Sequence, residues 1–170
     1  MAGTIEAANR PEGGAKFTLT LPLRWLGDAA RKPLPAVKPA GRSDFSGHRV
    51  LIVEDNDLNM EIALEFLQSL GVVCEGAENG RRAVEMFNAS APGYYEMILM
   101  DVRMPVMNGY EATREIRRLA REDARQIPIV AMTADAFSSD IKMALNAGMN
   151  EHLSKPVSIE RLQEVLGQWL

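Results

Sequence analysis

The chain lacks several features that would place it in well-known classes of protein. Cys74 is its single cysteine, so no internal disulfide can form. No apolar run approaches the roughly 18 residues that a membrane-spanning helix requires, and residues 1–10 have neither the basic nor the apolar region of a secretory signal. Asp and Glu (23) outnumber Lys and Arg (19), and the net charge of −4 argues against a nucleic-acid partner. We therefore expect a cytoplasmic chain without direct membrane contact, although a longer parent chain could be attached to a membrane.

The chain does contain enough apolar residues for a folded domain, arranged in three zones. Hydrophobic residues make up 46% and charged residues 25% of the sequence, as is typical of a globular protein. Within residues 1–26, apolar and Thr side chains alternate over positions 15–21, which predicts a strand. Residues 4–8 are placed to pair with it across a turn that contains Pro and Gly. Residues 27–47 carry three prolines and no sustained periodicity, which is typical of a linker.

From His48 onward, short apolar runs alternate with helical periodicity. This pattern predicts an α/β fold with a parallel sheet covered by helices on both faces, built from five βα units. The runs are continuous in apolar residues, as expected of strands that are buried on both faces. Gly71 is expected to end the first helix and Ser158 to cap the last. The predicted strands are residues 50–53, 72–74, 97–100, 127–132 and a short one at 152–153.

Ionisable and hydroxyl residues follow the predicted strands. Glu54 and Asp55 follow the first, Asp101 the third, Thr133 the fourth and Lys155 the fifth. Ligands of open α/β sheets bind outside the carboxyl ends of the strands, so neighbouring first and third strands would bring three carboxylates together. Two such charges about 4 Å apart repel by about 4 kcal/mol at an effective dielectric constant of 20. A purely structural role is hard to reconcile with this repulsion, although a solvated turn is the alternative for Glu54 and Asp55 taken alone.

The oxygen-rich cluster predicts a hard cation. Carboxylates that leave positions for water and phosphate oxygens suit Mg²⁺, whereas Zn²⁺ lacks suitably spaced ligands because Cys74, His48 and His152 are far apart. Once a cation neutralises the cluster, a carboxylate can attack a phosphoryl group and form an aspartyl phosphate. The ammonium of Lys155 and the hydroxyl of Thr133 would hold the transferring oxygens. The residues therefore predict Mg²⁺-dependent phosphoryl transfer to an aspartate.

The sequence contains four motifs, LIVEDND at 51–57, ILMDVRMPVMNGYEA at 98–112, IVAMTADA at 129–136 and EHLSKPV at 151–157. In this order, they closely resemble the motifs of the receiver domain of two-component response regulators. The resemblance covers residues 48–170 and implies a doubly wound, flavodoxin-like receiver fold with strand order 2-1-3-4-5. It also implies that Asp101 accepts a phosphoryl group from a phosphohistidine.

The same resemblance implies how the metal would be held. Asp55 and Asp101 would bind Mg²⁺ directly, and Glu54 more indirectly, often through water. The main-chain carbonyl of Arg103 would be the remaining protein ligand, so its side chain is not the metal-binding part.

Residues around the expected phosphorylation site are assigned in the same way. Thr133 and Lys155 would contact the phosphoryl oxygens, and the Lys155–Pro156 bond would be cis. His152 stands where receivers commonly place a Tyr or Phe that turns inward on phosphorylation. We expect it to couple to Thr133 more weakly and in a pH-sensitive way; the alternative is a partly buried ring bonded to a neighbour. Asp135 stands where the family tunes access of the hydrolytic water, and could equally cap the fourth helix.

The first predicted helix begins with residues that fall away from its buried stripe. Leu58 and Met60, as exposed apolar residues beside the site, could dock a histidine-bearing helix; ordinary surface exposure is the alternative. Asp57 and Asn59, next to them, are expected to be solvated.

Among receiver domains, the amino-acid sequences of these motifs look most like those of the receivers attached to hybrid sensor histidine kinases. Residues 3–23 resemble the final hairpin of the kinase ATP-binding domain, which implies that residues 1–26 are the remnant of that domain; a chance amphipathic hairpin is the alternative. The Asn- and Gly-rich boxes that hold ATP are absent, so this fragment is not expected to be a kinase, whereas its parent chain is. The expected partner is a histidine phosphotransfer domain or the cognate histidine kinase domain.

Other functions compete with this interpretation. A haloacid dehalogenase-like phosphohydrolase also attacks with an Asp after a strand, but it requires a second Asp two residues later, where Arg103 stands. A flavin-binding, flavodoxin-like module needs hydroxyls and glycines after the first strand, where EDND would repel phosphate. A receiver that acts only as a phosphate sink would keep the same residues.

Overall fold

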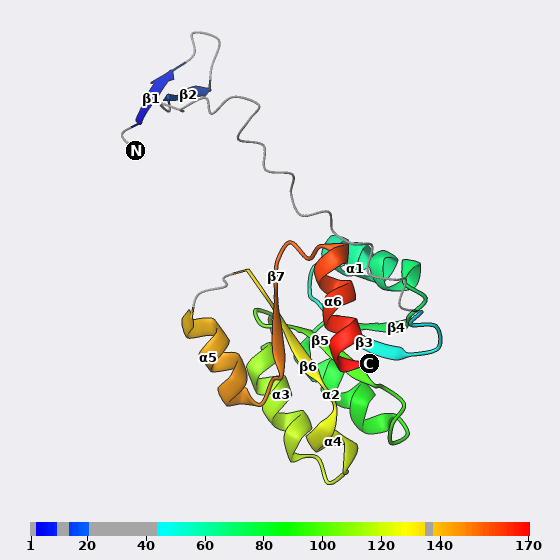
Figure 1. Cartoon of the computed structure of the whole chain (residues 1–170). Coiled ribbons are helices and arrows are strands. Elements are labelled where there is room, and N and C mark those ends of the chain that lie inside the picture. Colours follow the sequence, from blue (N-terminus) through cyan, green and yellow to red (C-terminus); the bar gives the residue numbers. More distant parts are fainter. Residues whose placement is uncertain (1–2, 10–13, 21–43, 135–137) are drawn as a thin grey trace. The chain divides into compact units, whose positions relative to one another are not determined.

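The computed structural model describes residues 3–9, 14–20, 44–134 and 138–170. The chain divides into two compact units, Met1–Gly41 and Arg42–Leu170; in Figure 1 the strands of the first are blue and the second runs from cyan to red. No helix in the described ranges combines the length and the apolar character that crossing a bilayer demands. Most of the predicted linker, 27–47, lies outside the described residues.

The first unit contains the predicted hairpin. β1 (Thr4–Asn9) pairs antiparallel with β2 (Ala15–Thr20), and the register places Ile5 opposite Leu19. Because alternate residues of a strand share a face, Phe17 lies beside Leu19, and the exposed fractions of these three apolar side chains are 62–71%. A two-stranded hairpin is marginally stable alone in water, so its exposed apolar face suits packing against a further layer.

The second unit is built on a five-stranded parallel sheet. Its strand order is β4-β3-β5-β6-β7, which is 2-1-3-4-5 when the strands of this sheet are counted along the chain. The predicted doubly wound fold is therefore confirmed. The central strands are almost wholly buried, as their continuous apolar sequences predicted. The strands are β3 (Arg49–Val53), β4 (Val73–Ala77), β5 (Met97–Asp101), β6 (Ile129–Thr133) and β7 (Glu151–Ser154).

The edge strand β4 lies further along the chain than predicted. It spans Val73–Ala77 instead of 72–74. Val72 is buried in the turn that precedes it, whereas Val73 is 41% exposed. An edge strand has only one neighbour and keeps one border in solvent. Its sequence need not be a continuous apolar run, so a prediction based on such runs misplaced this strand.

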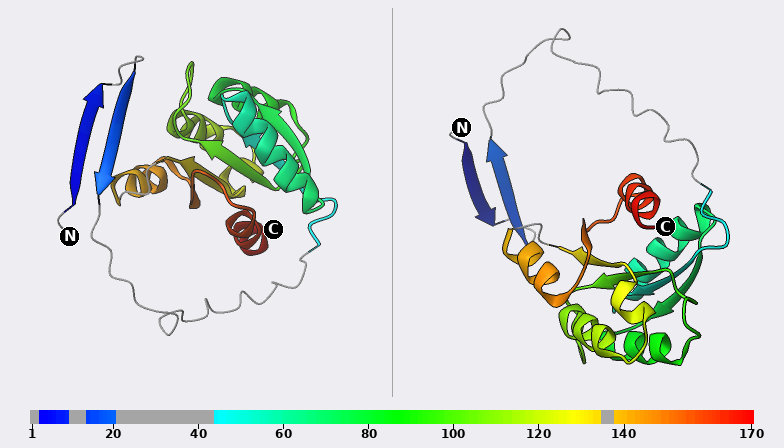
Figure 2. Two further views of the ribbon diagram at one scale, coloured as in Figure 1. Left: turned by 90° about the horizontal axis from the view of Figure 1, so that it is seen from above. Right: turned by 60° about the horizontal axis from the view of Figure 1, so that its bottom comes forward.

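Helices cover both faces of the sheet, as Figures 1 and 2 show. Buried residues of α1 and α6 form one core with one face, and those of α2, α3, α4 and α5 form a second core with the other. The four-residue helix α4 was not predicted, because so short a helix has no readable periodicity. The helices are α1 (Asp57–Ser69), α2 (Gly80–Ala89), α3 (Gly109–Arg118), α4 (Asp123–Gln126), α5 (Ser138–Ala147) and α6 (Ile159–Trp169).

The predicted helix boundaries at Gly71 and Ser158 are confirmed. Gly71, which follows the Leu70 cap of α1, has a φ of +85°, a conformation that glycine adopts without steric cost. The Ser158 side chain accepts a hydrogen bond from the main-chain N–H of Arg161 and caps α6. At the other end of the unit, Phe45 is buried against the core beneath α1 and α6. The packed unit thus extends to Phe45, within the segment predicted as linker.

Candidate functional site

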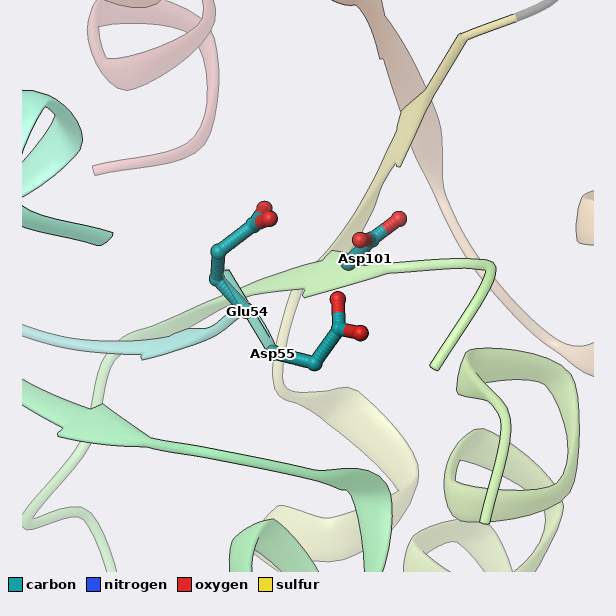
Figure 3. A group of neighbouring side chains, drawn as sticks. All are labelled: Glu54, Asp55 and Asp101. Atoms are coloured by element: carbon teal, nitrogen blue, oxygen red, sulfur yellow. The ribbon is translucent and has the colours of Figure 1, made fainter. Parts of the chain in front are cut away.

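Three carboxylates converge at the carboxyl edge of the sheet. Glu54 and Asp55 directly follow β3, and Asp101 is the last residue of β5, the neighbour of β3. One carboxylate oxygen from each side chain lies within 4.8 Å of the others, and Figure 3 shows the three groups turned toward one another. Glu54 and Asp101 are buried, whereas Asp55 is exposed. The predicted cluster therefore exists, and its oxygen ligands fit one hard cation.

Lys155 places its ammonium against this cluster. Its Nζ lies 2.5 Å from Oε2 of Glu54 and 2.7 Å from Oδ2 of Asp101. The main-chain N–H of Lys155 donates to the carbonyl oxygen of Thr133 at 2.8 Å, which ties the loop after β7 to the end of β6. The Lys155–Pro156 bond is cis, as predicted.

Burial and charge shift the pKa values of the central pair. Burial lowers the pKa of Lys155, but the hydrogen bonds and charges of Asp101 and Glu54 outweigh it, so the pKa lies above its ordinary value. Burial raises the pKa of Asp101, even though Lys155 and the main-chain N–H of Arg103 favour its ionised form.

Asn59 is exposed, as predicted, and it also contacts the acidic cluster. Its side-chain amide donates to Oε1 of Glu54 at 2.9 Å, so Glu54 is held by Asn59 on one oxygen and Lys155 on the other. Asn56 caps α1 by accepting from the main-chain N–H of Asn59, which fixes the first turn that carries this amide. The sequence did contain a signal for this contact: Asn59 follows the helix cap Asn56 by three residues and lies close behind the acidic pair Glu54 and Asp55.

The loop after β5 is shaped around Asp101. The main-chain N–H of Arg103 donates to Oδ1 of Asp101 at 3.1 Å, and that of Gly109 donates to the carbonyl oxygen of Val102. A Cβ atom on Gly109 would overlap the carbonyl oxygen of Asp101. No sequence pattern singles out this glycine, because the close approach arises from the return of the chain into α3.

The remaining predicted site residues lie around the cluster. Thr133 is buried at the end of β6. His152 is half-buried with Nδ1 3.2 Å from Oε1 of Glu151, and the register aligns it with Ala131, two residues before Thr133. Its bond to a neighbour matches the alternative that we considered, and its coupling to Thr133 stays a prediction. Asp135 lies outside the described residues.

The two predicted docking residues differ in their exposure to solvent. Leu58 is 63% exposed, whereas Met60 is half-buried against the core. A Cβ atom added to Gly76 of β4 would lie 3.0 Å from the Met60 sulfur, so Met60 packs over this glycine and was wrongly expected to be exposed. Ile62, 42% exposed, lines a cavity of about 320 Å³ with Lys155 and other residues of α1 and the loop after β7.

The family to which the sequence is matched agrees with the geometry of this site. The response regulator receiver domain family matches residues 50–167. The chain belongs to this family. Membership excludes the phosphohydrolase and flavin-binding alternatives for the receiver domain.

Two curated relatives are named as a sensor protein and a sensor kinase/phosphatase. The chain is 35% identical to the aerobic respiration control sensor protein ArcB of Escherichia coli over 174 residues, an alignment that covers 98% of this chain and 20% of ArcB. It is 40% identical to the autoinducer 1 sensor kinase/phosphatase LuxN of Vibrio campbellii, over 71% of this chain and 13% of LuxN. The chain therefore spans a fifth or less of the length of these relatives.

Solved structures show the same fold. The receiver domain of sensor histidine kinase PA1611 from Pseudomonas aeruginosa is 42% identical, with a TM-score of 0.66 over 73% of this chain and 98% of that domain, and has a magnesium ion coordinated in its active-site cleft. A co-crystal structure from Saccharomyces cerevisiae holds the histidine phosphotransfer protein Ypd1 and the receiver domain of Ssk1. The match is 33% identical, with a TM-score of 0.65 over 74% of this chain and 90% of the matched chain.

Proposed function

We propose that Asp101 of this receiver domain accepts a phosphoryl group from a phosphohistidine in a Mg²⁺-dependent phosphorelay step. One observation carries the proposal: Asp101 is a buried carboxylate, grouped with Glu54 and Asp55, with the ammonium of Lys155 at 2.7 Å. A nucleophile, a cation-binding cluster and a fixed positive charge are the elements that phosphoryl transfer requires.

The acidic cluster suits Mg²⁺. We assign Asp55 and Asp101 as direct ligands, together with the main-chain carbonyl of Arg103. Glu54 would act through water, because its two oxygens already accept hydrogen bonds. When bound, Mg²⁺ would neutralise the carboxylates and the charge that develops on the phosphoryl group. The magnesium ion in the PA1611 receiver domain supports this assignment by similarity.

In the transfer step, a carboxylate oxygen of Asp101 attacks phosphorus. A P–O bond forms while the P–N bond to the donor imidazole breaks, and the electron pair of that bond stays on the ring nitrogen. A phosphohistidine protonated on its other ring nitrogen thus departs as neutral imidazole. Lys155 would transfer part of its contact from Asp101 to a phosphoryl oxygen, and the hydroxyl of Thr133 would donate to another.

The proposed partner is a histidine phosphotransfer domain or a histidine kinase domain, as the Ypd1–Ssk1 complex suggests by similarity. The exposure of Leu58 supports its proposed role in docking this partner, and Ile62 extends the apolar surface along α1. Met60 contributes less, because it packs over Gly76. His152, Asp135 and Pro156 are proposed to tune the response.

We further propose that residues 1–26 end a kinase ATP-binding domain and that residues 27–47 link it to the receiver of a hybrid sensor kinase. The ArcB alignment, which extends over 98% of this chain, supports a shared arrangement across both units. The exposed apolar face of the hairpin would be covered by the preceding part of that domain.

The test is direct phosphorylation by a small donor. With Mg²⁺ and acetyl phosphate, the chain should gain the mass of one phosphoryl group, and excess EDTA should prevent the gain. Asp101→Asn should gain none, while Asp123→Asn, which changes an aspartate outside the cluster, should be phosphorylated like the wild type. An equal gain in Asp101→Asn would contradict the assignment.

A further inference from the structure

Asn59 is an exposed residue that forms a hydrogen bond with a buried carboxylate. It lies in the first turn of α1, where its main-chain N–H donates to Oδ1 of Asn56 at 3.0 Å. Its side-chain amide donates to Oε1 of Glu54 at 2.9 Å, while the relative exposure of Glu54 is only 4%. A hydrogen bond to an ionised group is stronger than one between neutral groups. The capped helix therefore holds this amide in a fixed place beside Glu54.

The other oxygen of Glu54 holds the cation that also serves Asp101. Nζ of Lys155 lies 2.5 Å from Oε2 of Glu54 and 2.7 Å from Oδ2 of Asp101. Both carboxylates are buried, and opposite charges attract more strongly in a buried site than in water. The two carboxylates therefore compete for one ammonium, and a stronger attraction to Glu54 leaves less of it for Asp101.

This competition bears on the transfer step. In the proposed reaction, part of the contact of Lys155 passes to a phosphoryl oxygen on Asp101. Glu54 opposes that movement, because a buried carboxylate that loses a partner is destabilised. Asn59 reduces the destabilisation, because its amide is held by α1 and not by Lys155. The amide is also a neutral donor, so it adds no positive charge that would repel Mg²⁺.

We infer that Asn59 is a positioning residue for phosphoryl transfer: by holding Oε1 of Glu54, it keeps this carboxylate from drawing Lys155 away from Asp101. This inference rests on the proposed phosphorelay function. Asn59 acts through Glu54 and Lys155, so loss of its amide should alter the surroundings of the Lys155 ammonium even without metal or phosphodonor.

The first measurement removes the amide and follows the rate of labelling. Glu54, Asn59 and Lys155 line the same cavity of about 320 Å³, which has room for water. Asn59→Leu is therefore a sharper variant than Asn59→Ala, since its apolar side chain fills the space in which water would replace the amide. At saturating Mg²⁺, we expect the rate constant for labelling by acetyl phosphate to fall about 10-fold. Asn59→Gln, which keeps a primary amide, should restore most of the rate.

The second measurement needs neither metal nor phosphodonor. In the metal-free chain, Asn59→Leu should shift the nuclear magnetic resonance signal of the Lys155 Cε carbon, which is assigned by its absence in Lys155→Met. In a Glu54→Ala background, the same substitution should leave that signal unchanged, because the amide then has no carboxylate to hold.

The matched control is Asn88→Leu, which alters an exposed asparagine of α2 outside the cluster. Its rate constant and its Lys155 signal should equal those of the wild type. A wild-type rate constant in Asn59→Leu, a wild-type Lys155 signal, or an equal shift in the Glu54→Ala background would each overturn the inference. Failure of acetyl phosphate to label the wild-type chain would instead contradict the proposed function.

Discussion

The ammonium of Lys155 lies 2.7 Å from the carboxylate of Asp101, although 54 residues separate them in the chain. The same Nζ contacts Glu54, so one cation is shared by two buried carboxylates. Without an added metal ion, Lys155 is thus the group that balances their repulsion. Its role in stability can be separated from its role in phosphoryl transfer.

Replacing Lys155 by Met should destabilise the metal-free protein. The apolar stem is kept while the ammonium is lost, and breaking a buried ion pair by removing one partner costs about 3 kcal/mol. Urea unfolding at pH 7 measures the change in the free energy of unfolding. Arg81→Met is the matched control: its ion pair with Glu115 is exposed and should contribute about 0.5 kcal/mol or less. Equal losses in the two variants would refute the shared-cation role.

Mg²⁺ should stabilise the wild-type chain through the acidic cluster. A ligand that binds only the folded state at ten times its Kd adds about 1.4 kcal/mol to the free energy of unfolding. Asp55→Asn removes an exposed ligand and should weaken Mg²⁺ binding about 10-fold or more in titration calorimetry. Glu115→Gln, outside the cluster, should leave the affinity unchanged. Undiminished affinity in Asp55→Asn would remove Asp55 from the ligand set.

Gly109→Ala should destabilise the receiver domain and perturb the phosphorylation site together. Its new Cβ would overlap the carbonyl oxygen of Asp101, and overpacking against main chain costs about 2 kcal/mol. In Gly167→Ala the new Cβ would lie 4.0 Å from Phe45, and an alanine inside α6 should stabilise by about 0.5–1 kcal/mol. Thermal unfolding and acetyl phosphate labelling measure both effects. If both substitutions changed the stability in the same direction, the predicted close approach at Gly109 would be contradicted.

A second ion pair should make stability depend on acidic pH. Both oxygens of Asp123 accept from Arg121 at 2.7 Å, and these bonds lower the pKa of Asp123 from 3.8 to about 2. Because the folded-state pKa is depressed, the stabilisation is present above the unfolded pKa and is lost as pH falls from about 4 to about 2. Discounted for partial exposure, the contribution is about 1 kcal/mol.

Asp123→Asn should abolish that acid-dependent loss. The free energy of unfolding, measured between pH 5 and pH 2 for the variant and the wild type, would show this difference. Glu115→Gln is the control: its ion pair is exposed, so the free energy of unfolding should depend on pH as in the wild type. Arg121 also donates to carbonyl oxygens in the last turn of α2 and just after it, including those of Phe87 and Ser90. Arg121→Ala should therefore be more destabilising than Asp123→Asn at pH 7.

His152 is predicted to couple phosphorylation to helix α5. His152→Ala should reduce the chemical-shift changes that acetyl phosphate induces in Ser138–Ala147. Glu151→Gln, which alters the group 3.2 Å from the imidazole, should leave these changes as large as in the wild type. Unchanged shifts in His152→Ala would end the hypothesis.

The order of residues along the chain was sufficient to predict the fold and the cluster. Continuous apolar runs identify buried parallel strands, and parallel strands align their carboxyl ends at one edge of the sheet. Glu54, Asp55 and Asp101 were therefore predicted to converge if the first and third strands are neighbours, with Thr133 and Lys155 assigned to the same edge. The resemblance to receivers implied that strand order, and the structure bears out both the order and the convergence.

Tertiary packing alone decided which atoms meet. Lys155 bridges Glu54 and Asp101, Asn59 holds the other oxygen of Glu54, and Met60 turns onto Gly76. These contacts depend on side-chain direction and on loops that approach one another from distant parts of the chain, which periodicity does not encode. The positive φ of Val106 likewise results from the tight return between β5 and α3. The sequence thus determined which residues reach the site, and the fold determined how each of them is held there.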